Sequence, residues 1–446
     1  MRTPVVGTRA TERGASGAGQ RARLLDAIVV VAASRGYANA RMADLVDHAG
    51  VSRATFYELF RDKEHCFLAA HGALAERLLA DTGKAVAQGD PQSAVDRVFA
   101  AVIEFAGRDP LAFTFLTHEA MLAGLVVMDE RDRLIDGLLA LVERAHEQAP
   151  TEASLPDVPV RALIGGLIRL LGIRLRRGPH NSERLRQDLI RWIDCYRVSE
   201  RHSRDAGPTV SPGVLERSER STPRVIAPQP LPKGRHRLPR TVVEGIQRQR
   251  LLHATAAAIH ANGYAATTVA DIVLAAGVSR EAFYSHFRNR PEAFIETHRL
   301  VFEQLMALTA GAFFSCTGSW PERVWGSGRA FARFIVDAPS LAHFGFTESY
   351  APGPELAQRT DDALLAFTVF LADGYSYRPA ANELPRVISE AIAATIMDAA
   401  AFYIRRGRSD ELIALLPRMS YVVLAPFMGT EAAHAFLDGK ARTDAA

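Results

Sequence analysis

Residues 263–287 read GYAATTVADIVLAAGVSREAFYSHF, and residues 36–60 read GYANARMADLVDHAGVSRATFYELF. The two stretches align without a gap and roughly half of their positions are identical, which chance seldom produces within one chain. The similarity extends upstream, where the recurring residues of the first copy are Gln20, Arg21, Arg23, Leu24, Leu25 and Ala27. The chain is therefore expected to contain one structural unit that occurs twice.

The apolar residues before Gly36 recur at helical spacing. Within residues 20–34 they are Leu24, Leu25, Ile28 and Val31. This period predicts an amphipathic helix, and Gly36 suits the left-handed turn that commonly ends one. A second, shorter helix is expected over about residues 42–49, with Gly50 in the turn after it.

Residues that cap helices stand where the next helices should begin. In the second copy Thr268 precedes the short helix and Asp271 follows three residues later, a capping arrangement. The first copy has Arg41 at the position of Thr268, so its cap is expected to be weaker. Ser52 and Ser279 are suited to cap a further helix in each copy.

This further helix has a buried and an exposed side. Val51 and Phe56 have the spacing of a hydrophobic staple, and Phe56 and Phe60 share a face, so both phenylalanines should enter a small core. The second copy repeats this with Val278, Phe283 and Phe287. Other faces carry Arg53 and Tyr57 in the first copy, and Arg280, Tyr284 and His286 in the second.

Two short helices joined by a glycine-containing turn are typical of the helix-turn-helix motif, whose second helix enters the major groove of DNA. The alternative is a helical hairpin inside an ordinary core. Because both copies combine the cap, the staple and an exposed arginine–tyrosine pair, the sequence favours DNA binding.

These residues resemble the N-terminal signature of the tetracycline-repressor (TetR) family of bacterial transcriptional regulators, over about fifty residues per copy. The resemblance implies an all-α chain of two TetR-like units, each with a three-helix head and a helical effector-binding and dimerisation domain. The partner it implies is a double-stranded DNA operator. The residues it implies for backbone and base-edge contacts are Ser52, Arg53, Thr55, Ser279, Arg280 and His286. Those it implies for phosphate contacts are Tyr57, Lys63, Tyr284 and Arg290.

Some positions depart from the family pattern. Glu58 and Leu59 stand where the family usually has polar or basic groups, and Glu281 adds an acidic residue to the second copy. We therefore expect one head to bind more weakly, and the first is the candidate. Lys63 and Arg290 should each begin a fourth helix, with Asp62 and Asn289 as caps and Pro291 in the first turn.

The chain is expected to divide into six segments. They are a disordered N-terminal arm (1–19), a first DNA-binding domain (20–66), a first ligand and dimerisation domain (67–200), a linker (201–240), a second DNA-binding domain (241–293) and a second ligand and dimerisation domain (294–446). The linker is rich in Pro, Ser and Arg without helical period. A coil of about forty residues spans roughly 35 Å, which is enough to let the two units pair.

The resemblance implies a pocket for a small hydrophobic effector in the later half of each unit, although its lining is not assigned. It also implies that the last two helices of each unit form a dimerisation surface, and that the fused units pair within one chain as a pseudo-dimer; further pairing of whole chains stays open. For the first unit this surface would use Leu163, Leu167, Leu170, Leu171, Ile190 and Ile193. For the second it would use Ile392, Ile396, Tyr403, Leu416 and Val423. Release of repression by the effector is the expected mechanism, with activation left open.

Composition sets the remaining limits. The net charge of +3 over 446 residues gives no case for nucleic acid by itself. The three cysteines lie far apart, so neither a metal site nor a disulfide is expected. Neither a secretory signal nor a membrane span is predicted, and we expect a cytoplasmic, nucleoid-associated protein.

The sequence contains no phosphate-binding Gly-Lys loop, no Gly-x-Ser-x-Gly elbow and no histidine pair at zinc spacing. We therefore expect no enzyme activity and no cofactor. The alternative to a regulator is a helical adaptor protein with degenerate DNA-binding heads, since Glu58, Leu59 and Glu281 weaken the motif.

Overall fold

The computed structural model describes residues 17–90, 93–148, 159–178, 182–197 and 239–445. Every regular element among these residues is helical, which confirms the predicted all-α class. Most of the predicted linker (201–240) and most of the predicted arm (1–19) lie outside the described residues, and Arg240 already begins a helix.

The chain divides into two compact units. The N-terminal unit comprises residues 1–205 together with residues 384–398, and the C-terminal unit comprises residues 206–383 and 399–446. The segment 384–398 thus lies late in the sequence but belongs to the unit built from the first copy.

The first repeat begins with a head of three helices, α1 (Gly17–Arg35), α2 (Met42–Ala49) and α3 (Arg53–Leu59). The 3₁₀ turn η1 (Tyr37–Asn39) joins α1 to α2. The later helices are α4 (Lys63–Ala87), α5 (Ala94–Arg108), α6 (Pro110–Thr114), the π-helical turn η3 (Phe115–Glu119), α7 (Ala120–Leu122), α8 (Leu125–Gln148), α9 (Val160–Arg176) and α10 (Ser182–Asp194). The predicted span 42–49 is confirmed as α2.

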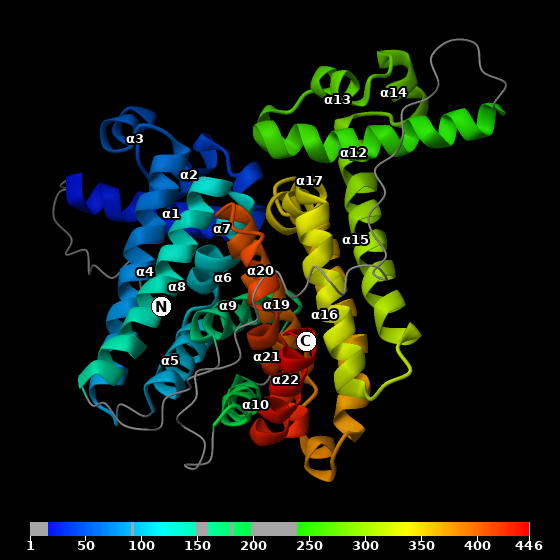
Figure 1. Cartoon of the computed structure of the whole chain (residues 1–446). Helices are drawn as coiled ribbons and strands as arrows, with labels where there is room; N and C mark the ends of the chain where they lie inside the picture. The colour runs from blue at the N-terminus through cyan, green and yellow to red at the C-terminus, as the bar shows by residue number, and fades with distance from the viewer. Residues whose placement is uncertain (1–16, 91–92, 149–158, 179–181, 198–238, 446) are drawn as a thin grey trace. The chain divides into compact units, whose positions relative to one another are not determined.

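The second repeat begins with the head helices α12 (Arg240–Ala266), α13 (Val269–Ala276) and α14 (Arg280–His286). Figure 1 shows α13 and α14 beside α12. The later elements are α15 (Arg290–Ser315), α16 (Trp320–Asp337), α17 (Pro339–His343), the π-helical turn η5 (Phe344–Glu348), α18 (Pro354–Ala366), the 3₁₀ turns η6 (Phe367–Ser376) and η7 (Pro379–Glu383), α19 (Val387–Arg405), α20 (Glu411–Ala414), α21 (Leu416–Met428) and α22 (Thr430–Ala445). The sequence pattern did not predict α22.

The repeat extends well beyond the heads. Pro110 begins α6 and Pro339 begins α17, while Arg176 ends α9 and Arg405 ends α19 at the same separation along the chain. The π-helical turns η3 and η5 also match at this separation. The register between the two copies is therefore fixed from α6 to the end of α9.

Helix α4 is 25 residues long and runs from the first head into the later helices of its repeat, and α15 does the same over 26 residues in the second repeat. The expected boundaries after residues 66 and 293 fall inside these helices. Each head is therefore joined to the later helices of its repeat by one continuous helix.

Helix α19 is long and apolar enough to cross a membrane by length and composition alone. However, 78% of its apolar window is buried inside the protein.

Candidate DNA-binding heads

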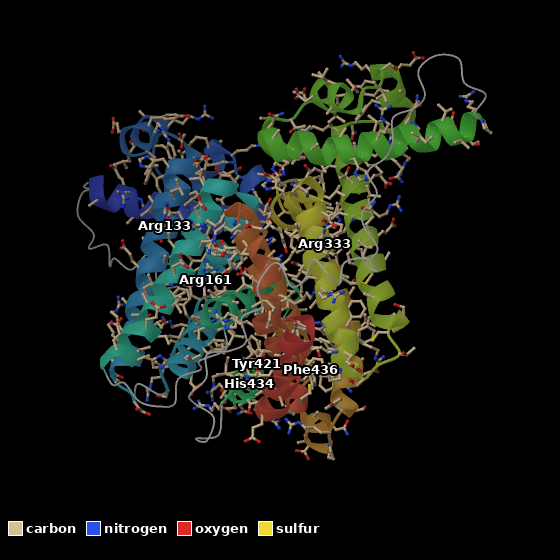
Figure 2. All side chains as sticks on the ribbon, in the orientation of Figure 1. Arg133, Arg161, Arg333, Tyr421, His434 and Phe436 are labelled. Carbon is tan, nitrogen blue, oxygen red and sulfur yellow. The ribbon has the colours of Figure 1, made fainter. Side chains whose placement is uncertain are left out.

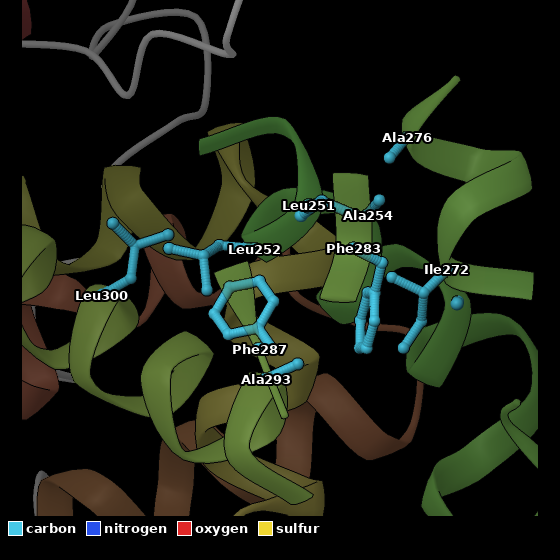
Figure 3. Packing of buried hydrophobic residues seen from close by; sticks show 10 residues of the cluster. Leu251, Leu252, Ala254, Ile272, Ala276, Phe283, Phe287, Ala293 and Leu300 are labelled. Carbon is cyan, nitrogen blue, oxygen red and sulfur yellow. The ribbon is translucent and has the colours of Figure 1, made fainter. Parts of the chain in front are cut away.

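The second head is held together by a small apolar core (Figure 3). Phe283 of α14 and Phe287 just after it are almost fully buried, as predicted, and pack with Leu251 of α12 and Ile272 of α13. Val278 packs against this cluster from just before α14. In the first head, Phe56 of α3 and Phe60 just after it are buried in the same way. The inner face of each third helix is therefore committed to packing.

The turn between the second and third helices of each head depends on glycine. Gly50 and Gly277 adopt φ values of 60° and 59°, in the left-handed region that other residues rarely enter. Each glycine N–H donates to carbonyls at the end of the preceding helix. A Cβ at Gly277 would also lie 2.9 Å from Nη2 of Arg250.

Serine caps fix the start of each third helix, as predicted. Ser52 Oγ accepts the backbone N–H of Thr55 at 3.0 Å, and Ser279 Oγ accepts that of Ala282 at 3.1 Å. The predicted cap of α13 is also present, since Thr268 Oγ1 accepts from Asp271 N at 3.3 Å. These bonds satisfy amide groups that a helix start leaves unpaired.

The outer face of each third helix is open to solvent. Tyr57 and Tyr284 are 58% and 48% exposed, and Arg53 and Arg280 are exposed beside them. In the second head the Arg280 guanidinium lies 5.7 Å from the centre of the Tyr284 ring. An exposed, cationic and aromatic surface on a rigid helix is suited to phosphates and base edges.

Three further predicted contact residues are less open. The hydroxyl of Thr55 lies 2.9 Å from Ser52 Oγ, and its side chain is half-buried. His286 is half-buried at the end of α14, and burial lowers the pKa of its imidazole. Leu59 is also half-buried, whereas Glu58 and Glu281 are exposed. The acidic departures therefore lie on the solvent side of the third helices.

Lys63 and Arg290 bind the protein's own backbone. Lys63 Nζ donates to Tyr37 O at 2.8 Å and to Ala40 O at 3.1 Å, and burial lowers the pKa of its ammonium group. Arg290 Nη1 donates to Tyr264 O at 2.9 Å and to the carbonyl of Thr267. These cations tie the start of the fourth helix to the loop after the first. Their predicted phosphate contacts stay a prediction.

The model of the tetR family of bacterial regulatory proteins matches the chain at residues 24–70 and again at residues 251–296. The chain carries two TetR-type heads in tandem. Each match covers the helix-turn-helix and the start of the fourth helix.

Curated relatives support this assignment. The transcriptional repressor KstR of Mycolicibacterium smegmatis is 27% identical over 158 residues, which cover 34% of this chain and 78% of the relative. KstR of Mycobacterium tuberculosis is 27% identical over 158 residues, covering 34% and 72%. A solved TetR-like regulator from Rhodococcus sp. RHA1 is 22% identical, covers 40% of this chain and 96% of its own, and has a TM-score of 0.31. About a third of the tandem chain spans most of a KstR relative, as expected when the family unit occurs twice.

Two contacts of the tandem TetR heads were not predicted. Arg23 Nε donates to Ala49 O at 2.9 Å and so holds α1 against the end of α2. Sequence comparison does contain a signal for it, because Arg23 recurs as Arg250 in the second copy. The second contact joins each head to its sensing half.

In that second contact, a buried glutamate reaches back from each π-helical turn to its head. Glu119 Oε2 accepts the backbone N–H of Tyr37 at 2.7 Å, and Glu348 Oε2 accepts that of Tyr264 at 3.3 Å. Both carboxyl groups are buried, and they occupy equivalent positions of η3 and η5. We call this pair of contacts the glutamate latch. It links Tyr37, in the turn after α1, and Tyr264, which follows the kink of α12 at Gly263, to the later helices of each repeat.

Burial raises the pKa of Glu119 to about 7, against the opposing effects of the Tyr37 hydrogen bond and of Arg176. In the second repeat His343 Nε2 lies 3.9 Å from Glu348 Oε1. Among the described residues, no group of His, Cys, Asp and Glu could hold a metal ion.

Proposed function

We propose that this protein is a tandem TetR-family transcriptional repressor that binds a DNA operator with both heads of one chain and is released by a small hydrophobic effector. The observation that carries the proposal is the outer face of α3 and α14. There exposed Arg and Tyr side chains stand on helices whose inner faces are buried. Repression is proposed because the KstR relatives are named repressors.

Pairing of the two repeats within one chain is supported by the segments that make up the N-terminal unit. That unit contains residues 384–398, which form most of α19 in the second repeat. Arg131 of α8 and Asp398 of α19 form an ion pair of 2.7 Å within it. A homodimer of ordinary family members would present two heads about one DNA turn apart, and a fused pair can present them from one chain.

A hydrophobic effector is supported by aromatic side chains in the sensing half of the second repeat. Phe331 and Phe367 lie 6.1 Å apart between ring centres, and Phe367 also contacts Phe302 and Phe370. Such an effector would weaken operator binding by its difference in affinity for the two head geometries. Addition of small hydrophobic compounds to the protein–DNA complex should reveal it as a loss of affinity.

The experiment that tests the function measures binding of the purified chain to genomic fragments, including the promoter next to its own gene, across a salt series. We expect one fragment to be strongly preferred. Its affinity should fall about a thousandfold or more between 50 and 200 mM salt, since several phosphate contacts release counterions. Uniformly weak binding to every fragment would instead favour the adaptor function, which the exposed Glu58 and Glu281 support.

The two heads are predicted to contribute unequally to operator binding. Tyr284→Phe should weaken binding by roughly tenfold, because it removes a hydroxyl that can donate to a charged phosphate. Tyr57→Phe should have a smaller effect, because Glu58 next to it opposes a phosphate. Substitution of tyrosine by phenylalanine leaves the ring in place, and Lys63 and Arg290 are left unchanged because they hold the loops. Titration of the preferred fragment with each variant measures the difference, and equal losses would contradict the asymmetry.

A further inference from the structure

A buried ion pair joins α8 to residue 398 within the N-terminal unit. Arg131 Nη2 and Asp398 Oδ1 are 2.7 Å apart, and both side chains are only 2% exposed. Asp132 lies beside Arg131, and Arg161 of α9 approaches Asp132 at 3.6 Å. A buried charge is tolerated only when a partner of opposite sign is well placed. The pairing of these helices therefore depends on which charges each one carries.

A second ion pair joins α9 to α19. Arg174 Nη2 lies 2.6 Å from Glu390 Oε2, and both side chains are partly buried. In both pairs the first repeat supplies the arginine and α19 supplies the carboxylate.

Between these pairs, two glycines of α9 allow a close approach. A Cβ at Gly166 would lie 2.1 Å from Thr395 Oγ1 and 2.7 Å from its Cα, and a Cβ at Gly165 would lie 2.1 Å from Asp398 Oδ2. The contact at Gly166 includes backbone, so it leaves no room for a side chain.

The register of the repeat gives these contacts a further meaning. At the separation that matches Arg176 with Arg405, Gly166 is equivalent to Thr395. Two equivalent residues in direct contact are expected where an approximate two-fold axis passes through an interface. By the same register Arg169 is equivalent to Asp398, and Arg161 is equivalent to Glu390.

We propose that α8, α9 and α19 form a pairing surface that accepts the other repeat of the same chain and rejects a second copy of either repeat. This proposal rests on one part of the proposed function, the pairing of the two repeats within one chain. It identifies the residues that select this pairing over the pairing of two identical repeats. In a pair of two identical repeats, each residue of the missing repeat would be replaced by its equivalent in the repeat that is present. The alignment of the two repeats therefore tells which residues would meet.

Pairing of two first repeats would place arginine against arginine. Arg131 would meet Arg169 in place of Asp398, and Arg174 would meet Arg161 in place of Glu390. Like charges brought together out of water lose both hydration and any compensating attraction. The first repeat is therefore excluded from pairing with itself by charge.

Pairing of two second repeats would fail for a steric reason. Thr395 would meet Thr395 at the position where Gly166 now has no room for a Cβ. Asp398 would also face Thr360, the equivalent of Arg131, and would lose its cationic partner. Only a first repeat paired with a second repeat brings opposite charges together and leaves room for Thr395 at Gly166.

The same chain is the expected source of the unlike repeat. The two repeats are covalently joined, and a covalent link can give two binding surfaces an effective concentration in the millimolar range. A partner in a second chain would have to compete with it.

The test uses full-length chains that carry two different affinity tags and are co-expressed. The wild-type chains should not co-purify, and each should have the mass of one chain, 48.7 kDa. Asp398→Arg should lower the melting midpoint by roughly 10 °C, as expected for a broken buried pair in a domain of this size. It should not make the chains co-purify, because every copy then lacks the carboxylate that Arg131 needs.

The rescue variant is Arg131→Asp with Asp398→Arg, which restores opposite charges and should recover most of the midpoint. Arg133→Asp is the matched control. Arg133 lies two residues along α8 from Arg131, is 66% exposed and forms an ion pair with Glu130, so its reversal should leave the midpoint unchanged (Figure 2). If Asp398→Arg is insoluble, recovery of a soluble chain by the rescue variant supports the proposal, and failure of that rescue overturns it.

Gly166→Thr gives an independent arm, since it copies the residue of the second repeat. It should lower the melting midpoint without making the chains co-purify, because the added side chain meets the Thr395 backbone in every copy, whereas a wild-type midpoint would overturn the steric part of the proposal. Co-purification of the wild-type chains would overturn the pairing outright. Operator binding by the wild-type chain is measured separately, so a chain that binds its operator but pairs like with like disproves the pairing surface and leaves the regulator intact.

Discussion

Replacement of Phe283 by alanine should abolish operator binding through the second head while most of the helical content remains. Phe283 is fully buried in α14 and packs in the only core that the small head has among the described residues. Loss of a buried phenylalanine side chain costs about 3–5 kcal/mol, because apolar contacts are lost and a cavity is left. A three-helix head has little other packing to offset this.

Binding of the preferred fragment and far-UV circular dichroism measure the two halves of this prediction. Affinity should fall by more than a hundredfold, while the ellipticity falls by no more than the share of the three helices of the second head. Phe283→Leu is the conservative variant, and it should retain most of the affinity since it fills much of the same space. Phe314→Ala is the matched control, because Phe314 is 66% exposed. An affinity of Phe283→Ala close to wild type would show that α14 does not hold its position through this core.

The heads could be predicted from sequence because their determinants are local. The cap at Ser52, the left-handed Gly50 and the phenylalanines four residues apart all act within about ten residues. Each of these features recurs in the second copy, which makes a chance occurrence improbable. The buried phenylalanines and both serine caps are confirmed by the structure.

The contacts that sequence analysis missed join residues far apart in the chain. The family resemblance implied a phosphate contact for Lys63, which stays a prediction, but it did not indicate that the ammonium group donates to the carbonyls of Tyr37 and Ala40. These bonds depend on how the loop after Gly36 folds back, which no local pattern encodes. The interaction of Glu119 with the same loop spans 82 residues, and only the register of the two repeats could have suggested it.

The pairing helices show the same limit. Sequence analysis predicted that α9 and α19 contribute to dimerisation surfaces, and Leu163 and Ile392 are indeed buried. However, the apolar period of a helix indicates only that one of its faces is buried, and it does not indicate which helix packs there. The charges that select the partner, such as Arg131 and Asp398, lie on different repeats. Their complementarity could not be seen before the helices were brought together.

The glutamate latch predicts a pH-dependent stability in the first repeat. The pKa of Glu119 is raised from 4.5 to about 7 in the folded chain, chiefly by burial. The folded state therefore holds the proton more tightly than the unfolded state, so stability is highest below pH 4.5 and falls as the pH rises to 7. A shift of this size corresponds to about 3 kcal/mol.

Glu119→Gln should remove this dependence. Glutamine stays neutral and its carbonyl can still accept the N–H of Tyr37, so the variant should match wild type near pH 4.5 and exceed its melting midpoint at pH 8. Thermal unfolding of both proteins between these pH values measures the difference. The comparison cancels other titrating groups, including His118, whose pKa burial holds well below its usual value.

The same variants separate the latch from a mere packing role. Glu119→Leu fills similar space but leaves the Tyr37 N–H without its acceptor, which costs about 1–3 kcal/mol. Because that N–H belongs to the turn between α1 and α2, the head should lose its fixed orientation, and operator affinity should fall about tenfold. Glu119→Gln should bind the operator as wild type does. Equal affinities for the leucine and glutamine variants would mean that the head is oriented by α4 alone, with no contribution from the carboxyl group of η3.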